Sequence, residues 1–197
     1  MPQPGKSKSL AVALLAAGAS RRFGDADKLA APFRGTMLGL FTARAIPREA
    51  FAKALVIAPG LDHPCTAGWE EAGYAVHANP RAHEGMGTSV ALAARLAQAA
   101  EVDALLIALA DMPLVPSEHY SALARAAGES GPDAIVVSSD GAARMPPAIF
   151  GAEHFGRLTG LEGDMGARAI LSQGSILDCP PAWLADIDTP EALAALE

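Results

Sequence analysis

Short apolar runs alternate with longer amphipathic stretches along the first 139 residues. The apolar runs are bounded by Gly, Pro or charged residues, a pattern typical of strands buried on both faces. We expect strands at Leu10–Leu15, Ala54–Ala58, Tyr74–His77, Asp103–Leu109 and Ala134–Ser138. Between them, the periodicity and breakers predict helices at Met37–Ile46, Thr66–Ala72, Ser117–Ala127 and from a cap at Thr88 or Ser89 to about Ala100.

This alternation predicts an α/β fold with a mostly parallel sheet and helices on both of its faces. Such sheets bind ligands at the carboxyl ends of their strands. The chain shows no internal repeat, linker or low-complexity segment, so we expect one domain over residues 1–197. Residues 1–8 are polar and are expected to form a frayed tail.

The alternation is looser after residue 139, where an antiparallel strand or a lid is expected. Asp140–Pro147 is rich in turn residues, and a terminal helix should have Thr189 as its N-cap and Pro190 at its first position. Short strands are expected at Ala148–Phe150 and Ser175–Leu177, and helices at Glu153–Leu158 and from about residue 163 to Gln173.

The first apolar run is followed by a small-residue turn that carries three cations, Arg21, Arg22 and Lys28. Backbone N–H groups in such a turn can approach phosphate closely, so we interpret residues 15–28 as a polyphosphate cradle. Two alternatives stay open: a strand–helix connection with solvated arginines, and a secretory signal with a small-residue cleavage site. The turn lacks the Gly-Lys-Ser/Thr of a Walker loop and the G-x-G-x-x-G of a dinucleotide fingerprint.

The charge distribution favours an anionic ligand at this turn. The net charge is −7, which argues against a general nucleic-acid binder, yet six of the fifteen Lys and Arg residues lie within the first 34 positions. Cys65 and Cys179 lack metal-site spacing and are expected to be cytosolic thiols, although a disulfide is not excluded. No apolar run approaches the length of a membrane span, so we expect a cytoplasmic protein without a membrane partner.

Two aspartates are expected at the same sheet edge as the cradle. Asp111 follows the strand at 103–109, and Asp188 follows a short apolar stretch at 183–187. Two carboxylates beside phosphates suggest Mg²⁺, which prefers hard oxygen ligands. The alternative is that both aspartates are helix caps or turn residues. The five histidines are scattered, so a zinc site is not expected.

Taken together, these motifs resemble the nucleotidyltransferases of the molybdenum-cofactor branch, the molybdopterin cytidylyl- and guanylyltransferases and their relatives. The resemblance covers nearly the whole chain, and the matching segments are Leu15–Gly24 (LAAGASRRFG), Asp27–Leu29 (DKL), Gly85–Ser89 (GMGTS), Ala110–Pro113 (ADMP), Gly163–Arg168 (GDMGAR) and Asp186–Pro190 (DIDTP). It implies a three-layer α/β/α sandwich with a mixed, mostly parallel sheet, of the nucleotide-diphospho-sugar transferase type.

The resemblance also implies roles for individual residues. Catalysis would depend on Arg22 and Lys28, which would contact the phosphates, and on Asp111, which would hold Mg²⁺ with the help of Asp188. The acceptor would contact Asp164 and Arg168. The remaining nucleotide-binding positions would be Leu15, Ala16, Ala17, Gly18, Ser20 and Arg21 in the first turn and Asn79, Gly85, Met86, Gly87 and Ser89 around the base or sugar.

Within that family, Leu-Ala-Ala-Gly at the first turn is associated with CTP and Leu-Ala-Gly-Gly with GTP, so Ala17 favours CTP. The implied acceptor is molybdopterin, and a molybdoenzyme could receive the product. The segment Arg144–Pro147 (RMPP) departs from the Gly-His-Pro-like turn of cytidylyltransferase relatives. Three alternatives therefore stay open: a GTP-using relative, a transferase acting on a sugar phosphate or another phosphorylated alcohol, and a nucleotide-binding protein that delivers cofactor without chemistry.

Overall fold

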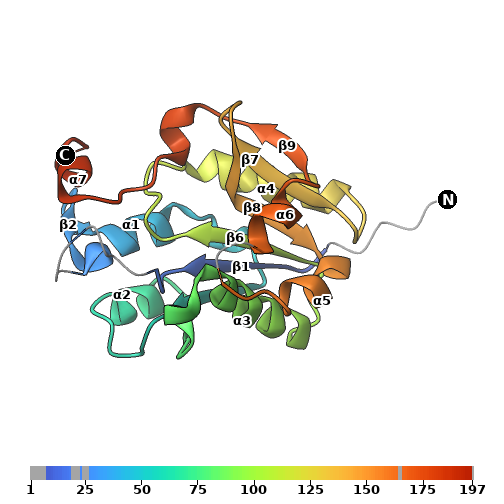
Figure 1. Cartoon of the computed structure of the whole chain (residues 1–197), viewed down its shortest axis with the longest axis horizontal. Helices are drawn as coiled ribbons and strands as arrows, with labels where there is room; N and C mark the ends of the chain where they lie inside the picture. The colour runs from blue at the N-terminus through green and yellow to red at the C-terminus, as the bar shows by residue number, and fades with distance from the viewer. Residues whose placement is uncertain (1–7, 19–22, 24–26, 164–165, 197) are drawn as a thin grey trace.

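The computed structural model describes residues 8–18, 23, 27–163 and 166–196, without the side chains of residues 166–168. A seven-stranded sheet runs through the molecule in the order β5-β4-β1-β6-β8-β7-β9 (Figure 1). Its strands are β1 (Leu10–Leu15), β4 (Lys53–Ala58), β5 (Ala75–Ala78), β6 (Ala104–Leu109), β7 (Ile135–Ser139), β8 (Arg144–Gly151) and β9 (Ser175–Asp178). Strand β8 is antiparallel to β6 and β7, whereas the other neighbouring pairs are parallel. A separate hairpin pairs β2 (Pro32–Phe33) with β3 (Thr36–Met37).

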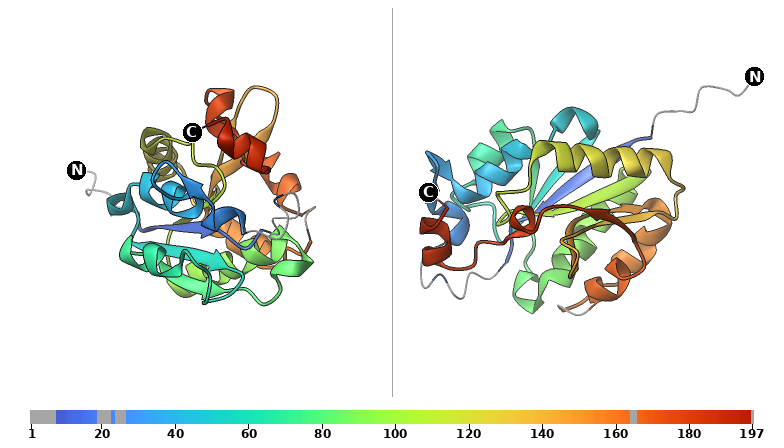
Figure 2. Two further views of the ribbon diagram at one scale, coloured as in Figure 1. Left: turned by 90° about the vertical axis from the view of Figure 1, so that its left-hand side faces the viewer. Right: turned by 90° about the horizontal axis from the view of Figure 1, so that it is seen from above.

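Helices cover both faces of the sheet, as the view from above in Figure 2 shows. One apolar core packs the sheet against α1, α2 and α4, and a second packs it against α3, α5 and α6. The helices are α1 (Leu38–Ala45), α2 (Thr66–Glu71), α3 (Met86–Ala99), α4 (Ser117–Glu129), α5 (Phe155–Leu158), α6 (Gly166–Leu171) and the C-terminal α7 (Pro190–Ala194). The predicted α/β sandwich with three layers and a mostly parallel mixed sheet is confirmed.

Strand β1 shows why the first apolar run has no polar positions. Leu10, Val12 and Leu14 enter the core beneath α1 and α4, and the intervening Ala11 and Ala13 enter the core beneath α3. All six residues of the strand are buried, as expected for a central strand with a helical layer on each side. The run that also resembled a secretory signal is therefore a central strand of the sheet.

Two predicted boundaries are wrong. Helix α3 begins at Met86, because Gly85 occupies the N-cap with a φ of 120° that a side chain would disfavour. Thr88 and Ser89, which were the predicted caps, lie inside the helix and are buried. Strand β8 begins at Arg144, so the expected turn covers only residues 140–143.

The C-terminal segment crosses the carboxyl edge of the sheet as a loop. Pro181–Leu184 forms a 3-10 helix, and the following backbone leads to Asp188 without forming a strand. The backbone N–H of Ile187 donates to the carbonyl oxygen of Asp111 over 2.9 Å. The predicted start of the last helix is confirmed, since the Thr189 side chain accepts a hydrogen bond from the N–H of Ala192 and Pro190 opens α7.

Cys65 and Cys179 are both free thiols. Within the described residues, no helix combines the length and apolar character needed to cross a membrane.

Candidate active site

Three charged side chains from distant parts of the sequence meet at the carboxyl edge of the sheet. The Lys28 ammonium lies 2.7 Å from Asp111 Oδ2 and 3.1 Å from Asp188 Oδ1. The three side chains are 10%, 22% and 37% exposed respectively, so the cluster is partly withdrawn from water but open on one side. The structure thus brings together the lysine and both aspartates that the sequence placed at this edge.

The two carboxylates hold Lys28 in its charged form. Burial by itself lowers the pKa of the Lys28 ammonium, but the charges and hydrogen bonds of Asp111 and Asp188 outweigh this effect and leave the pKa above its usual value. The ammonium is therefore protonated at neutral pH.

Backbone hydrogen bonds fix Asp111 relative to the first strand. The N–H of Ala110 donates to the carbonyl oxygen of Leu15 over 3.0 Å, which continues the ladder between β1 and β6. The hydroxyl of Thr42 on α1 donates to the carbonyl oxygen of Ala110 over 3.1 Å. Together with the bond from Ile187, these contacts set Asp111 at the junction of β1, β6 and the C-terminal loop.

The turn that bears Lys28 has its own cap. Lys28 opens the 3-10 helix Lys28–Ala30, and Asp27 Oδ1 accepts hydrogen bonds from the N–H groups of Leu29 (2.9 Å) and Ala30 (3.4 Å). The second carboxylate oxygen of Asp27 lies 2.8 Å from Nε2 of His63. No sequence pattern indicates this partner, because His63 lies in a loop without periodicity.

The turn after β1 is partly described. Leu15, Ala16 and Ala17 are buried, and Gly18 is exposed. A Cβ built at Gly18 meets nothing within 4 Å among the described residues. The predicted residues Ser20, Arg21, Arg22 and Asp164 lie outside the described residues, as does the side chain of Arg168.

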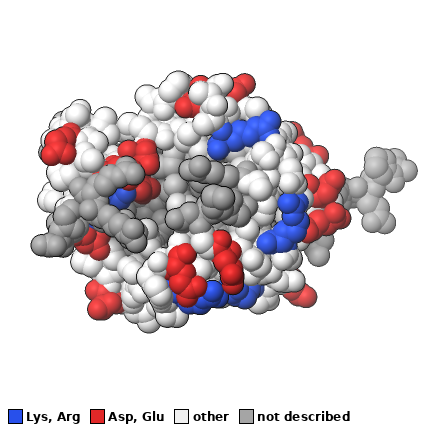
Figure 3. Space-filling model, in the orientation of Figure 1, with Lys and Arg blue, Asp and Glu red and all other residues white. Residues whose placement is uncertain are grey.

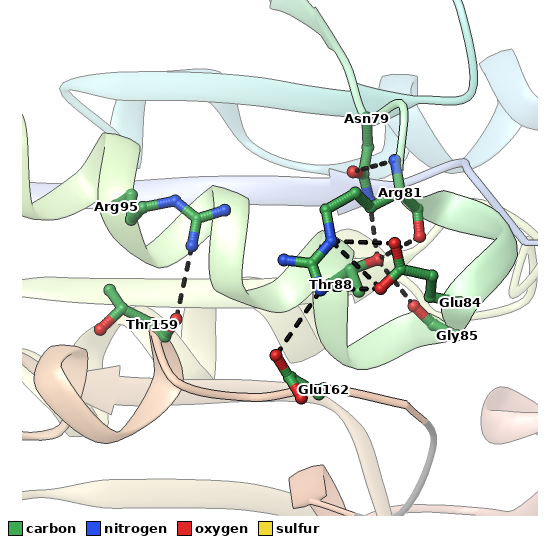
Figure 4. Close-up of polar contacts among 8 residues, drawn as sticks. All are labelled: Asn79, Arg81, Glu84, Gly85, Thr88, Arg95, Thr159 and Glu162. Atoms are coloured by element: carbon green, nitrogen blue, oxygen red, sulfur yellow. Dashed lines mark hydrogen bonds and ion pairs between the residues drawn. The ribbon is translucent and has the colours of Figure 1, made fainter.

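Asn79 organises the loop that precedes α3 (Figure 4). Its amide nitrogen donates to the hydroxyls of Thr88 (3.0 Å) and Ser89 (2.9 Å), and its Oδ1 accepts from the N–H of Arg81 over 3.0 Å. Asn79 and both hydroxyl residues are buried. Arg81 in turn forms a fork with Glu84 on the exposed side of the loop. The side chains of Asn79 and Ser89 therefore shape this loop from inside.

The start of α3 touches the segment that precedes α6. The N–H of Gly87 donates to the carbonyl oxygen of Gly163 over 2.7 Å. A Cβ at Gly87 would lie 2.5 Å from that oxygen, so the contact requires glycine. Glu162 Oε1 lies 3.6 Å from Arg81 Nη2, and a dashed line joins the two side chains in Figure 4. Met86 is half-exposed and, with Pro146 and Phe150, lines an apolar cavity of about 30 Å³.

The donor set at this edge suits a hard divalent cation. Oxygens of Asp111 and Asp188 converge on one cationic atom, and Mg²⁺ commonly binds through one or two carboxylates together with substrate phosphates. Among the described residues, no group of three or more His, Cys, Asp or Glu residues is arranged to hold a metal. On the face shown in Figure 3, acidic and basic side chains are interspersed rather than gathered into one large patch of either sign.

This fold, with a small-residue turn after β1 and a lysine between two aspartates, is that of an α/β nucleotidyltransferase. The chain belongs to the family of MobA-like NTP transferase domains, which matches residues 12–177.

The chain is similar along almost its whole length to several known proteins. The purine catabolism protein PucB of Bacillus subtilis (strain 168) is 32% identical over 204 residues, covering 94% of this chain and 95% of that protein. Among solved structures, Rv0371c of Mycobacterium tuberculosis H37Rv superposes with a TM-score of 0.79 at 21% identity, covering 97% of this chain and 98% of the other. A structure of that mycobacterial protein in complex with manganese gives a TM-score of 0.67 at 20% identity, covering 96% of this chain and 98% of the other.

A nucleotidyl transferase from Methanothermobacter thermautotroptrophicus, Mth528, gives a TM-score of 0.75 at 18% identity and covers 95% of both chains. At these identities the structural likeness shows the fold.

Proposed function

We propose that this protein is a cytoplasmic, Mg²⁺-dependent cytidylyltransferase that moves CMP from CTP to the terminal phosphate of molybdopterin and releases pyrophosphate. The observation that carries the proposal is the meeting of Lys28 with Asp111 and Asp188 beside the turn at Leu15–Gly18. Membership of the NTP transferase family supports nucleotidyl transfer. Ala17 in the Leu-Ala-Ala-Gly turn supports CTP.

The triphosphate would lie over the first turn. Gly18 is exposed, a Cβ there would meet no atom of the described residues within 4 Å, and the backbone of a small-residue turn suits phosphate oxygens. Lys28 would contact the phosphates together with Arg22, with Ser20 and Arg21 contributing from the same turn. Across the site, the loop from Asn79 to Ser89, including Gly85, Met86 and Gly87, would hold the base or sugar.

Asp111 and Asp188 would hold the divalent cation, which when bound neutralises negative charge on the triphosphate. In the structure the Lys28 ammonium contacts one oxygen of each of these carboxylates. A divalent cation bound by the two carboxylates would replace Lys28 as their partner and leave its ammonium available for the phosphates. The manganese complex of the mycobacterial protein supports a divalent metal in a protein of this fold.

The reaction needs no protein nucleophile. An oxygen of the acceptor's terminal phosphate attacks the α-phosphorus of CTP in line, a P–O bond forms to the acceptor, and the bond to the β-phosphate oxygen breaks. Such transfers are accelerated mainly by positioning and by neutralising charge that develops in the transition state. Lys28 and Arg22 would stabilise the departing pyrophosphate.

The acceptor would bind beside Asp164 and Arg168. Arg144, which stands in the segment that departs from relatives, donates to the carbonyl oxygens of Ser172 and Gly174, so its guanidinium joins β8 to the turn before β9. Molybdopterin as acceptor, and a molybdoenzyme as recipient of the product, rest on the resemblance to molybdopterin nucleotidyltransferases. The Bacillus relative is named for purine catabolism, which describes that protein's pathway and names no acceptor.

The test is incubation of the purified protein with Mg²⁺ and each of the four nucleoside triphosphates, with either molybdenum-bearing molybdopterin or a sugar phosphate as acceptor, followed by pyrophosphate assay and mass analysis. We expect pyrophosphate with CTP and a product heavier by one CMP unit. Preference for GTP would favour a guanylyltransferase, and turnover only with a sugar phosphate would replace the acceptor. If no combination of triphosphate and acceptor releases pyrophosphate, the result would favour a nucleotide-binding protein that delivers cofactor without chemistry.

The same assay tests the metal ligands. Asp111→Ala should abolish Mg²⁺-dependent pyrophosphate release, whereas Asp133→Ala, at an exposed aspartate before β7, should not. Retained Mg²⁺-dependent release in Asp111→Ala would show that Asp111 is not a ligand.

A further inference from the structure

His63 is a buried histidine that points at the lysine-bearing turn from a different part of the fold. It lies in the loop between β4 and α2, and its side chain is 3% exposed. Its Nε2 lies 2.8 Å from Asp27 Oδ2, and Asp27 directly precedes Lys28. Burying a polar ring costs free energy unless its nitrogens are hydrogen-bonded, and one nitrogen of this ring contacts the carboxylate next to Lys28.

The surroundings of His63 fix its tautomer. Nδ1 accepts a hydrogen bond from the N–H of Cys65 over 3.1 Å, so the ring proton of the neutral imidazole belongs to Nε2. Nε2–H therefore donates to Asp27. The ring also stacks on Trp69, with centroids 4.9 Å apart and planes 24° apart, and Trp69 Nε1 donates to the carbonyl oxygen of Gly39 over 2.9 Å. The imidazole is held at both nitrogens and at one face.

Asp27 transmits this orientation to Lys28. One carboxylate oxygen accepts from His63, while the other caps the 3-10 turn at the N–H groups of Leu29 and Ala30. The Asp27 side chain is 39% exposed, and among the described residues His63 is the side chain that holds its second carboxylate oxygen. The thiol of Cys65 donates to the carbonyl oxygen of Leu29 over 3.3 Å, which joins the same two segments a second time.

We propose that His63 is a positioning residue for nucleotidyl transfer: it orients Asp27, and through the capped turn it sets the Lys28 ammonium between Asp111 and Asp188. This inference rests on the proposed function, in which Lys28 neutralises phosphate charge. Placement to within a fraction of an ångström matters for such a group, because small displacements of charged groups cost large factors in rate.

Two substitutions at His63 separate this role from simple packing. His63→Gln places an amide nitrogen near the position of Nε2 and keeps the donor for Asp27. His63→Asn places an amide oxygen near the position of Nδ1, so it keeps the acceptor for Cys65 but cannot reach Asp27. Both variants lose the stacking on Trp69, and His63→Gln also loses the acceptor for the N–H of Cys65, so a merely structural histidine would make His63→Gln at least as poor as His63→Asn.

We expect His63→Asn to lower kcat about tenfold, as loss of a contact behind a site residue commonly does, and His63→Gln to stay within about twofold of the wild type. Asp27→Asn keeps the capping oxygen but turns an amide donor toward Nε2–H, so it should match His63→Asn. The double variant Asp27→Asn/His63→Asn should be no slower than either single variant, because both remove one contact. Equal loss in His63→Gln and His63→Asn, or no loss in either, would overturn the proposal.

Crystal structures of the two His63 variants supply a readout that does not depend on turnover. The Lys28 ammonium should keep its contacts with Asp111 and Asp188 in His63→Gln and leave them in His63→Asn. An unmoved Lys28 in His63→Asn would refute the positioning role. If the wild-type protein releases no pyrophosphate from any triphosphate, the proposed function fails, but these structures still decide whether His63 positions Lys28.

Discussion

At the scale of single residues, Lys28 links the two carboxylates of the candidate site. Its ammonium forms ion pairs with both Asp111 and Asp188. Lys28→Met keeps a similar stem and removes the charge, so we expect kcat for pyrophosphate release to fall about 10²- to 10³-fold. The fold should persist, because both carboxylates retain access to water. Circular dichroism checks the fold beside the turnover assay.

Lys53→Met is the matched control, because Lys53 is an exposed lysine at the start of β4 and has no place in the proposed site. Its turnover should equal that of the wild type. Wild-type turnover in Lys28→Met would remove Lys28 from the mechanism.

His119 is a second residue whose charge state matters, in this case for stability. Burial lowers the pKa of the imidazole, with Glu118 opposing weakly. Nε2 lies 2.7 Å from Ser138 Oγ, which donates to the carbonyl oxygen of Pro147 over 2.6 Å. Because the folded-state pKa is depressed, the contribution of neutral His119 to stability is present above the ordinary histidine pKa and is lost as the pH falls through the folded-state pKa.

The free energy of unfolding should therefore decrease between pH 7 and pH 5 more steeply in the wild type than in His119→Gln, which keeps an amide nitrogen for Ser138. Urea titrations at several pH values measure both slopes. Identical slopes would mean that His119 does not contribute to the acid sensitivity.

At the scale of elements, the contact between α3 and the segment before α6 depends on Gly87. An added Cβ would lie 2.5 Å from the carbonyl oxygen of Gly163, so Gly87→Ala should destabilise the protein by about 1–3 kcal/mol and lower activity. Gly128→Ala in α4 is the control, because a Cβ there meets nothing within 4 Å. Because Gly128 lies in the last turn of α4, alanine there should leave the stability unchanged or raise it by up to about 0.5 kcal/mol. Urea unfolding measures both, and equal stabilities would contradict the tight contact.

Most elements could be predicted because their apolar periodicity reflects burial on the sheet. The boundaries predicted wrongly lie where tertiary contacts override the local preferences of the residues. Thr88 and Ser89 look like helix caps, but Gly85 takes the N-cap and Asn79 uses both hydroxyls. The turn residues and prolines before Ala148 do not indicate a strand, so the first half of β8 was not predicted. In this part of the sheet, the pairing of β7 with β8 shifts register between Val137 and Ser138.

At the scale of the whole molecule, the candidate site lies where the parallel strands β1 and β6 end. Lys28 follows β1, Asp111 follows β6, and Asp188 arrives on the loop beyond β9. The meeting of these residues could be predicted, because carboxyl ends of parallel strands share one edge. The pairing of His63 with Asp27 could not, because it joins two aperiodic loops whose approach depends on the packing of Trp69 beneath α1.

Ligand binding should raise the stability of the whole molecule, because a nucleotide that binds only the folded protein shifts the unfolding equilibrium. At a concentration about 100-fold above Kd, the gain is about 2.7 kcal/mol. For a chain of this size, that corresponds to a rise in Tm of about 5–10 °C. If the proposed cytidylyltransferase function is right, CTP with Mg²⁺ should give a larger rise than GTP with Mg²⁺. Thermal denaturation with each nucleotide, with and without Mg²⁺, measures this difference.

The variant Asp111→Asn tests the proposed metal ligand in the same measurement. The rise in Tm due to Mg²⁺ should disappear while the rise due to CTP alone remains, because the proposal assigns the carboxylate to the cation and the first turn to the phosphates. An Mg²⁺ increment that survives in Asp111→Asn would place the cation elsewhere.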